Sequence, residues 1–519
     1  MAIGSTLSVG LIGLKAFIVQ VQAFISPGLP YFSIIGLPDA SLSEARERVK
    51  SACQATGFGW PQTRVTVNMS PAAMPKRGSS HDLAIAASVL CAAGAIGHDC
   101  LEDTIVLGEV NLDGSVLPIH GLLPIMLHAE ERGVRKMIVP HRNLDEASMV
   151  DGLDVVGVRH VGELIELMGG DATYTIPDTP VTDETTTDQS PTSHPNDCGD
   201  MNEVLGQEHA KWALQVAAAG GHNILLVGPP GSGKSMLSKR LPSILPDMTR
   251  QEQLEVTQIY SVLGLLPAEH PLIESRPFRA PHHTVSAAAL AGGGTYVRPG
   301  EISLAHKGVL FLDELPEFRR DAIESMRQPL EDGQVTISRV QGSQTFPCEF
   351  MLVCAMNPCP CGWYGDPSGR CTCSQAAVDR YLSRISGPML DRVDMIVEVS
   401  SVKFDELRSR SEAEPSSAIK ARVDAARSIQ NTRYSGTSTR CNAYMQPAQL
   451  RTFCQLDEDC TALMKQAFDA LGMTARSYDR VLKVARTIAD LAGSDQIRPE
   501  HIAEAVQYRS FQLGGENAR

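Results

Sequence analysis

The chain has 519 residues, of which 43% are hydrophobic and 20% charged, and this ordinary globular composition excludes a fibrous protein and a chain disordered throughout. Its formal net charge of −14 gives no support for a protein that coats nucleic acid without selectivity. A chain of this length exceeds one hydrophobic core, so we expect about three domains.

The amino-terminal segment begins with an alternating apolar pattern. Residues 1–26 read MAIGSTLSVGLIGLKAFIVQVQAFIS, and Lys15 stands where a signal peptide would have an uninterrupted apolar core. The alternation is typical of strands. The apolar runs elsewhere are shorter than a membrane span, so we expect a cytoplasmic protein without a membrane partner.

Residues 1–170 form the first predicted domain. Residues 64–91 read as a strand, a loop and an Ala-rich helix, and residues 108–140 read as strand, turn, strand, helix and strand. Both stretches resemble the proteolytic domain of Lon, whose Ser-Lys dyad implies a nucleophile at Ser80. The place of the dyad lysine falls on Leu123, and a serine without a base is a weak nucleophile.

Lys76 and His81 are basic residues close to Ser80 in the sequence. Nothing in the sequence places either side chain beside the Ser80 hydroxyl. We therefore predict a Lon-like α/β domain that is catalytically inactive and is retained for assembly or for nucleic-acid contact.

Residues 171–200 are rich in Thr, Pro, Ser and Asp and contain few large apolar residues. Such a segment buries too little surface to offset its ordering entropy, so we predict a flexible linker.

A glycine-rich motif opens the second half of the chain. The apolar run NILLV leads directly into GPPGSGKS, which is a P-loop in its expected context of strand, turn and helix. Its backbone N–H groups converge on phosphates, its lysine reaches the terminal phosphates, and its last serine ligates Mg²⁺. The residues that we predict to bind ATP are Gly228, Pro229, Pro230, Gly231, Ser232, Gly233, Lys234 and Ser235.

Two later strands end in polar residues. GVLFLDE ends in Asp313 and Glu314, which suit the Mg²⁺ shell and the polarisation of a water molecule respectively. FMLVCAMNP ends in Asn357, which can hold the attacking water from the other side. The alternative, ordinary strands followed by polar turns, is less favoured beside a P-loop.

A cysteine-rich loop, residues 358–373, follows directly. Its sulfur ligands are Cys359, Cys361, Cys371 and Cys373, in a C-x-C pair, a nine-residue gap and a second C-x-C pair. Reduced cytosolic cysteines in a loop without a core favour a structural Zn²⁺ site, which would stiffen a protrusion near the nucleotide. Reduced thiols without a metal are the alternative.

The order of these motifs, together with SGPMLDRVD, resembles the ComM/YifB family of AAA+ ATPases of the magnesium chelatase subunit I type. The resemblance implies an AAA+ core with a parallel sheet at 201–402 and a helical lid at 403–519. It also implies a homo-oligomeric ring, expected to be a hexamer, with ATP between neighbouring subunits. By the same likeness, Arg392 is the finger given to the neighbour and Arg476 is the sensor 2 residue.

Physical alternatives remain for both arginines. Arg392 can instead form a surface ion pair with Asp391 or Asp394, and Arg480 lies one helical turn after Arg476 and can replace it.

The resemblance implies a DNA motor that drives branch migration of recombination intermediates, as in natural transformation. The segment 276–307 carries basic residues among glycines, which can track phosphates in a pore. The candidates there and in the next strand are Arg276, Arg279, His282, His283, Arg298, Lys307 and Arg339. The alternatives are a magnesium chelatase subunit, remodelling of a protein client and a scaffold that does not hydrolyse nucleotide.

Overall fold

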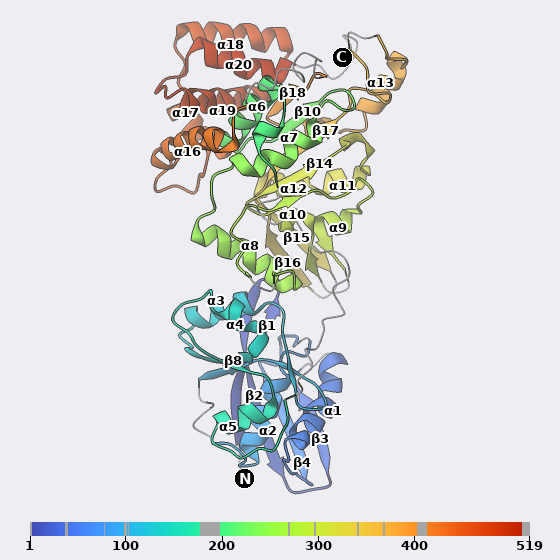
Figure 1. The fold of residues 1–519 in the computed structure, drawn as a ribbon, viewed down its shortest axis with the longest axis vertical. Helices are drawn as coiled ribbons and strands as arrows, with labels where there is room; N and C mark the ends of the chain where they lie inside the picture. Colours follow the sequence, from blue (N-terminus) through green and yellow to red (C-terminus); the bar gives the residue numbers. More distant parts are fainter. Residues whose placement is uncertain are drawn as a thin grey trace. The chain divides into compact units, whose positions relative to one another are not determined.

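The structure is a computed structural model of the chain. It describes residues 3–36, 40–76, 78–97, 101, 103–176, 198–267, 270–294, 297–339, 342–366, 369–401 and 413–510. Most of the predicted linker (177–197), two residues of the cysteine loop (367–368) and the start of the predicted lid (403–412) lie outside the described residues. The chain divides into two compact units (Figure 1).

The first unit is built on a seven-stranded mixed sheet of order β3-β4-β2-β1-β5-β8-β9. Its strands are β1 (Ile3–Ile12), β2 (Lys15–Ser26), β3 (Tyr31–Ile35), β4 (Arg64–Ser70), β5 (Thr104–Val106), β8 (Lys136–Pro140) and β9 (Asp154–Val158). A separate two-stranded ribbon joins β6 (Glu109–Val110) to β7 (Val116–Leu117). The strands predicted from the alternating amino-terminal pattern are confirmed, because β1 and β2 pair as an antiparallel hairpin.

Two apolar clusters lie on opposite faces of this sheet. Val19 and Val21 belong to one cluster, whereas Val9 and Ile105 belong to the other. The helices of this unit are α1 (Ala40–Ala55), α2 (Asp82–Ala92), α3 (Leu122–Glu131), α4 (Leu144–Ala147) and α5 (Val161–Leu167). All residues of α2 are buried, which explains its Ala-rich sequence: small side chains allow close packing on β1 and β2.

The first unit also contains residues Gln253–Ile273, which lie within the predicted ATPase core in chain order. They include most of α8 (Arg250–Leu263). The backbone carbonyl of Ser261 accepts a hydrogen bond from Gly121 N at 3.0 Å, and the Ser261 hydroxyl donates to the carboxylate of Glu146. Two separate stretches of the chain therefore build this unit.

The second unit contains a five-stranded sheet of order β11-β14-β17-β10-β18, in which every neighbouring pair is parallel. The strands are β11 (Phe278–Arg279), β14 (Val309–Leu312), β17 (Met351–Met356), β10 (Ile224–Val227) and β18 (Met395–Glu398). The predicted α/β core with a parallel sheet is confirmed. Four further strands form two antiparallel ribbons: β12 (Gly292–Gly293) with β13 (Arg298–Pro299), and β15 (Gln334–Arg339) with β16 (Gly342–Pro347).

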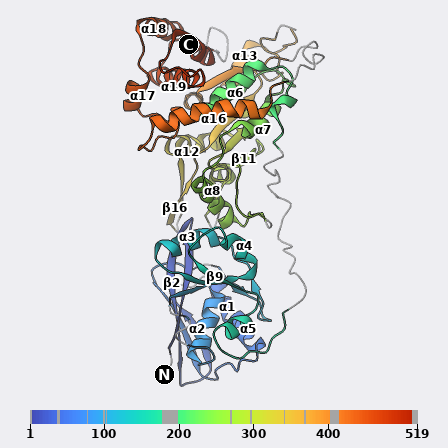
Figure 2. The same cartoon turned by 60° about the vertical axis from the view of Figure 1, so that its left-hand side comes forward.

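Helices surround this sheet and form the carboxy-terminal part of the unit (Figures 1 and 2). The helices before β18 are α6 (Glu208–Gly220), α7 (Lys234–Arg240), α9 (Ala287–Ala291), α10 (Glu301–Leu304), α11 (Arg320–Ser325), α12 (Arg327–Asp332), α13 (Gln375–Leu382) and α14 (Gly387–Leu390). Those after it are α16 (Ser416–Arg433), α17 (Pro447–Phe453), α18 (Glu458–Leu471), α19 (Ala475–Leu491) and α20 (Pro499–Ser510).

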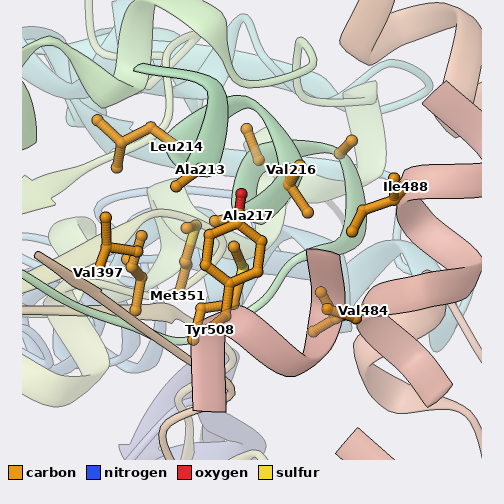
Figure 3. Close-up of a cluster of buried hydrophobic side chains, with 14 of the residues drawn as sticks. Ala213, Leu214, Val216, Ala217, Met351, Val397, Val484, Ile488 and Tyr508 are labelled. Carbon is orange, nitrogen blue, oxygen red and sulfur yellow. The ribbon is translucent and has the colours of Figure 1, made fainter. Parts of the chain in front are cut away.

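One apolar core joins these carboxy-terminal helices to the sheet. Val484 and Ile488 of α19 lie beside Val216 and Ala217 of α6, and Tyr508 of α20 fills the space near them (Figure 3). The aromatic side chain of Tyr508 is 1% exposed, so its burial contributes roughly 2–3 kcal/mol to stability. Across the described ranges, no helix combines the length and apolar character needed to cross a membrane.

Candidate nucleotide site and cysteine cluster

The P-loop connects β10 to α7. Its glycines Gly231 and Gly233 have φ angles of 77° and 91°, in the left-handed region that glycine adopts without strain. A turn of this kind directs successive backbone N–H groups toward one point, which makes a concave site for an anion.

The side chain of Lys234 lies inside this turn. Its Nζ donates hydrogen bonds to the carbonyls of Gly228 and Pro229, both at 2.8 Å, and lies 3.3 Å from Oδ1 of Asn357. Burial lowers the pKa of the Lys234 ammonium, while the charge of Asp313 acts in the opposite direction. The structure thus brings together the lysine and the amide that the sequence singled out in distant motifs.

Ser235 and the carboxylates after β14 lie on the other side of the turn. The Ser235 hydroxyl donates to Oδ2 of Asp313 at 2.6 Å, and Oδ1 of Asp313 accepts from the backbone N of Glu314 at 2.9 Å. A hydroxyl and a carboxylate oxygen are the ligand types that Mg²⁺ takes in proteins, so this pair can hold the ion that accompanies ATP.

The Glu314 carboxylate has different surroundings. Its side chain is 57% exposed, and its Oε2 lies 3.4 Å from Nδ1 of His283. Glu314 itself has a φ of 54°, an uncommon backbone conformation for a residue other than glycine. In this turn the Glu314 carboxylate lies beside His283 and remains accessible to solvent.

These groups meet because their strands are parallel neighbours. The P-loop follows β10, Asp313 follows β14 and Asn357 follows β17, and the register places the ends of these strands side by side. The carboxyl ends of parallel strands are where ligands bind in open α/β sheets. We call this the carboxyl edge of the sheet.

Gln207 is a contact to the P-loop that the sequence analysis missed. Its Nε2 donates to the carbonyl of Ser232 at 3.2 Å and to that of Ser400 at 2.6 Å. The residue has a φ of 61° and lies directly before α6. The dipeptide Gly206-Gln207 signals a turn, but no local pattern connects it to a loop that begins 21 positions later.

Arg392 lies near the opposite end of the strands, in the loop between α14 and β18. Its guanidinium donates to the carbonyls of Arg327 at 3.0 Å and Pro388 at 2.6 Å and forms an ion pair with Glu331. The sequence alternative of an ion pair thus exists in this structure, but its partner is Glu331 rather than Asp391 or Asp394. The Glu331 side chain is 54% exposed, so water can compete for its carboxylate.

Asp394 stabilises the part of this loop that follows Arg392. Its carboxylate is 3.2 Å from Nε of Arg480 and 3.6 Å from Nδ1 of His222. Burial alone would raise the pKa of Asp394, but the hydrogen bond and charge of His222 and the charge of Arg480 lower it. Arg480 is therefore engaged within the unit, while Arg476 is exposed in the first turn of α19.

The predicted cysteine ligands converge. The sulfur atoms of Cys359, Cys361, Cys371 and Cys373 all lie within 4.8 Å of one another, and Cys361 is 3.3 Å from Cys359 and 3.7 Å from Cys371. A tetrahedron with metal–sulfur bonds of about 2.3 Å has edges of about 3.8 Å, so this set can hold a metal ion. Backbone N–H groups of Trp363 and Thr372 lower the pKa of Cys361 to about 6, whereas burial and hydrogen bonds with Cys361 and Cys359 raise the pKa of Cys371 and that of Cys373, the latter to about 11.

The cysteine loop packs against the P-loop. A β-carbon at Gly362 would lie only 2.5 Å from Cδ of Pro230, so glycine is required for this approach. The neighbouring Cys359 is completely buried. A change in the conformation of one loop therefore has to be accommodated by the other.

In the first unit, Ser80 is half-buried and its carbonyl accepts a hydrogen bond from Gly108 N at 2.9 Å. Leu123 is buried in α3. Lys76 Nζ donates to the carbonyl of Pro71, and His81 Nδ1 lies 2.8 Å from the hydroxyl of Ser8. These contacts of Lys76 and His81 are to residues other than Ser80, and the inactivity of the domain stays a prediction.

Models of one protein family match three parts of the chain. The model for magnesium chelatase, subunit ChlI, matches residues 200–407, and that for subunit ChlI of Mg-chelatase matches residues 21–143. The model for the carboxy-terminal part of subunit ChlI matches residues 413–509.

Full-length relatives are also similar. The chain is 38% identical to the competence protein ComM of Haemophilus influenzae over 512 residues, which cover 98% of each protein. It is 38% identical to YifB of Escherichia coli over 501 residues, or 96% of each. An uncharacterized protein of Mycobacterium tuberculosis is 42% identical over 510 residues, which cover 98% of this chain and 99% of the relative.

Proposed function

The chain belongs to the ComM and YifB family of magnesium-chelatase-like AAA+ ATPases, and on this basis we propose that it is a ring-forming motor that uses ATP hydrolysis to move branched DNA. The ATPase assignment follows from the family. The ring, the DNA substrate and branch migration are the parts of the proposal that need experimental tests.

The observation that carries the proposal is the cluster at the carboxyl edge, where Nζ of Lys234 lies 3.3 Å from Oδ1 of Asn357 and the hydroxyl of Ser235, the next residue, donates to Asp313 at 2.6 Å. Mg²⁺, bound by Ser235 and Asp313, would neutralise charge on the phosphates. Lys234 supports the terminal phosphates, and the accessible carboxylate of Glu314 accepts a proton from the attacking water while Asn357 orients that water. A passive scaffold would not need this complete set.

A neighbouring subunit supplies the missing positive charge in this proposal. Arg392 lies away from the carboxyl edge of its own subunit, and its partner Glu331 is more than half exposed. If Arg392 exchanged Glu331 for the phosphates bound by an adjacent subunit, hydrolysis would depend on assembly. We therefore propose a homo-oligomeric ring, with six subunits as the expected number, and Arg476 as a second contact to nucleotide.

We propose fewer residues as DNA contacts than the sequence alone indicated. Arg276 donates to the carbonyls of Pro246 and Lys307, Arg279 forms an ion pair with Glu301, and Lys307 forms one with Glu349. These side chains hold the second unit together. The exposed residues His282, Arg298 and Arg339 are the better candidates for phosphate contact.

We propose that the cysteine cluster binds Zn²⁺ as a structural ion. Four thiolates close its coordination shell and leave no open position for catalysis. Because Gly362 packs on Pro230, the ion would stabilise the P-loop from outside.

A magnesium chelatase-type ATPase subunit is the second candidate function, since models of subunit ChlI match three parts of the chain. The relatives matched over nearly the full length are ComM and YifB, which favours the DNA motor. Remodelling of a protein client is a further alternative.

The decisive experiment measures ATPase activity with no DNA, linear duplex DNA, forked DNA and four-way DNA, together with strand displacement. We expect branched DNA to stimulate hydrolysis and Glu314→Gln to abolish displacement while DNA binding persists. Glu317→Gln is the matched control, because it lies on the same turn and pairs with the exposed Arg384. ATPase activity that is indifferent to every DNA would contradict the proposal, and stimulation by a porphyrin substrate would favour the second candidate.

A further inference from the structure

We propose that Asn223 is a positioning residue that fixes Arg392 for catalysis in the adjacent subunit. The inference rests on the proposed role of Arg392 as a residue that acts on a neighbour's nucleotide. Asn223 lies directly before β10, at the end of the strand opposite the P-loop. We call this the amino edge of the sheet.

The side chain of Asn223 bridges two segments that are distant in sequence. Its Nδ2 donates to the backbone carbonyl of Arg392 at 3.0 Å, and its Oδ1 accepts from the backbone N of Leu352 at 2.8 Å. The amide orientation is unambiguous, because a carbonyl partner requires a donor and an N–H partner requires an acceptor.

The backbone of Asn223 holds the same loop a second time. Its N–H donates to Oδ2 of Asp394 at 3.0 Å, and its carbonyl accepts from the N–H groups of Asp394 and Met395 at 2.9 and 3.1 Å. Every hydrogen-bonding group of this residue is thus used, and all but one bond connect it to residues 392–395.

The one remaining bond leads to β17, the strand that Asn357 directly follows. Leu352 belongs to β17, which pairs with β10 along its length. A rigid pair of strands therefore extends from Asn223 at the amino edge to the P-loop and Asn357 at the carboxyl edge. Through this pair, the loop of Arg392 has a fixed position relative to its own subunit's nucleotide site.

The guanidinium of Arg392 is held independently. Its contacts are to Glu331, the carbonyl of Arg327 and the carbonyl of Pro388, none of which involve Asn223. Asn223→Ala should consequently loosen the backbone at Arg392 by removing the donor to its carbonyl, while the backbone bonds to Asp394 and Met395 and the charge of Arg392 remain. A misplacement of about 1 Å in a catalytic group costs about a hundredfold in rate, so the effect is expected to be large.

A purely structural role would affect the subunit that carries the change, whereas positioning of Arg392 would affect its neighbour. Mixed rings separate the two. Donor subunits carry Glu314→Gln, which removes their own hydrolysis but keeps Arg392. Acceptor subunits carry Arg392→Ala, which removes the residue given to the neighbour but keeps their own site. In a mixture of the two, hydrolysis occurs only where a donor's Arg392 meets an acceptor's nucleotide.

Asn223→Ala is then added to one partner at a time. We expect a ten- to hundredfold loss of mixed-ring ATPase when it is placed in the donor, and a change within about twofold when it is placed in the acceptor. Asn223→Asp keeps the acceptor for Leu352 and removes the donor to Arg392, so it should reproduce the donor-specific loss if Asn223→Ala does not fold. Asn202→Ala, at an exposed position of the same unit, is the control.

Equal losses in both placements, or a loss only in the acceptor, would overturn the inference and assign Asn223 to its own subunit's fold or P-loop. No loss in either placement would overturn it as well. An unmodified donor and acceptor mixture without activity would instead contradict the proposed sharing of Arg392 between subunits, so the two failures are distinguishable.

Discussion

The two edges of the sheet in the second unit contain similar residue types in opposite states. At the carboxyl edge, Glu314 is 57% exposed, whereas Lys234 is buried and Ser235 and Asp313 bond to each other. At the amino edge, the Asp394 side chain is 12% exposed, and its partners Arg480 and His222 are also largely buried. The carboxyl edge leaves the Glu314 carboxylate accessible to solvent, and the amino edge uses Asp394 to fix backbone position.

A polar residue at the end of a strand therefore does not by itself reveal whether it binds a ligand or stabilises the fold. A carboxylate such as Asp394, with charged partners inside the fold, stabilises a loop, whereas Glu314 retains access to water. Buried networks of this kind lose much stability when one partner is removed, because the other is left unpaired. Removal of the Glu314 carboxylate should therefore affect mainly the chemistry, whereas removal of a buried partner of Asp394 should affect mainly the stability of the fold.

The largest expected effect is at Arg392, because its charge would act on the transition state. Arg392→Ala should lower the ATPase kcat by about 10³- to 10⁵-fold, with nucleotide binding retained. Arg319→Ala, which removes an exposed arginine paired with Asp321, is the control and should change kcat by less than about twofold. Full activity of a purified Arg392→Ala protein in a permanently monomeric state would remove the role assigned to this residue.

Glu314→Gln tests the carboxyl edge itself. Loss of the general base should lower kcat by about 10²- to 10⁴-fold and leave binding of ATP within about twofold, since the Lys234 and Ser235 contacts persist. Steady-state kinetics and fluorescence binding of a nucleotide analogue measure the two effects. A proportional loss of binding would mean that Glu314 supports the turn rather than the chemistry.

Cys361→Ser tests whether the cysteine cluster binds the proposed zinc ion and whether that ion supports the P-loop. Removal of one thiolate should weaken zinc binding by about a hundredfold or more and lower ATPase activity, because the loop packs on Pro230 through Gly362. A zinc-sensitive dye in a chelator titration reports the affinity. Cys198→Ser, outside the cluster, should retain both zinc and activity; zinc loss without any effect on ATPase would separate the two sites.

The smallest effect is expected at Gln207, which supports the P-loop from outside. Gln207→Ala removes hydrogen bonds to the carbonyls of Ser232 and Ser400, each of which contributes about 1 kcal/mol. We expect the KM for ATP to rise about fivefold while kcat stays within about twofold. Gln334→Ala on the exposed side of β15 is the control, and an unchanged KM would show that these bonds serve only the fold.

Much of the carboxyl edge was predictable because its information is local. The P-loop, Asp313 and Asn357 each follow an apolar run, and these runs are confirmed as β10, β14 and β17. Since the strands of such a core are parallel, the order of motifs along the chain already predicted that their ends would meet. The spacing of the cysteines likewise predicted a cluster whose sulfur atoms converge.

The sequence by itself therefore determined the α/β core, the family and the residues next to each strand, because short-range patterns of apolar and polar residues report local structure. Tertiary structure alone decided that Gln207 supports the P-loop, that Glu331 holds Arg392, that residues 253–273 join the first unit, and that Asn223 connects the strands to the Arg392 loop. These contacts join residues that are tens to hundreds of positions apart. Their partners are set by how the strands and helices pack in space, which no local pattern records.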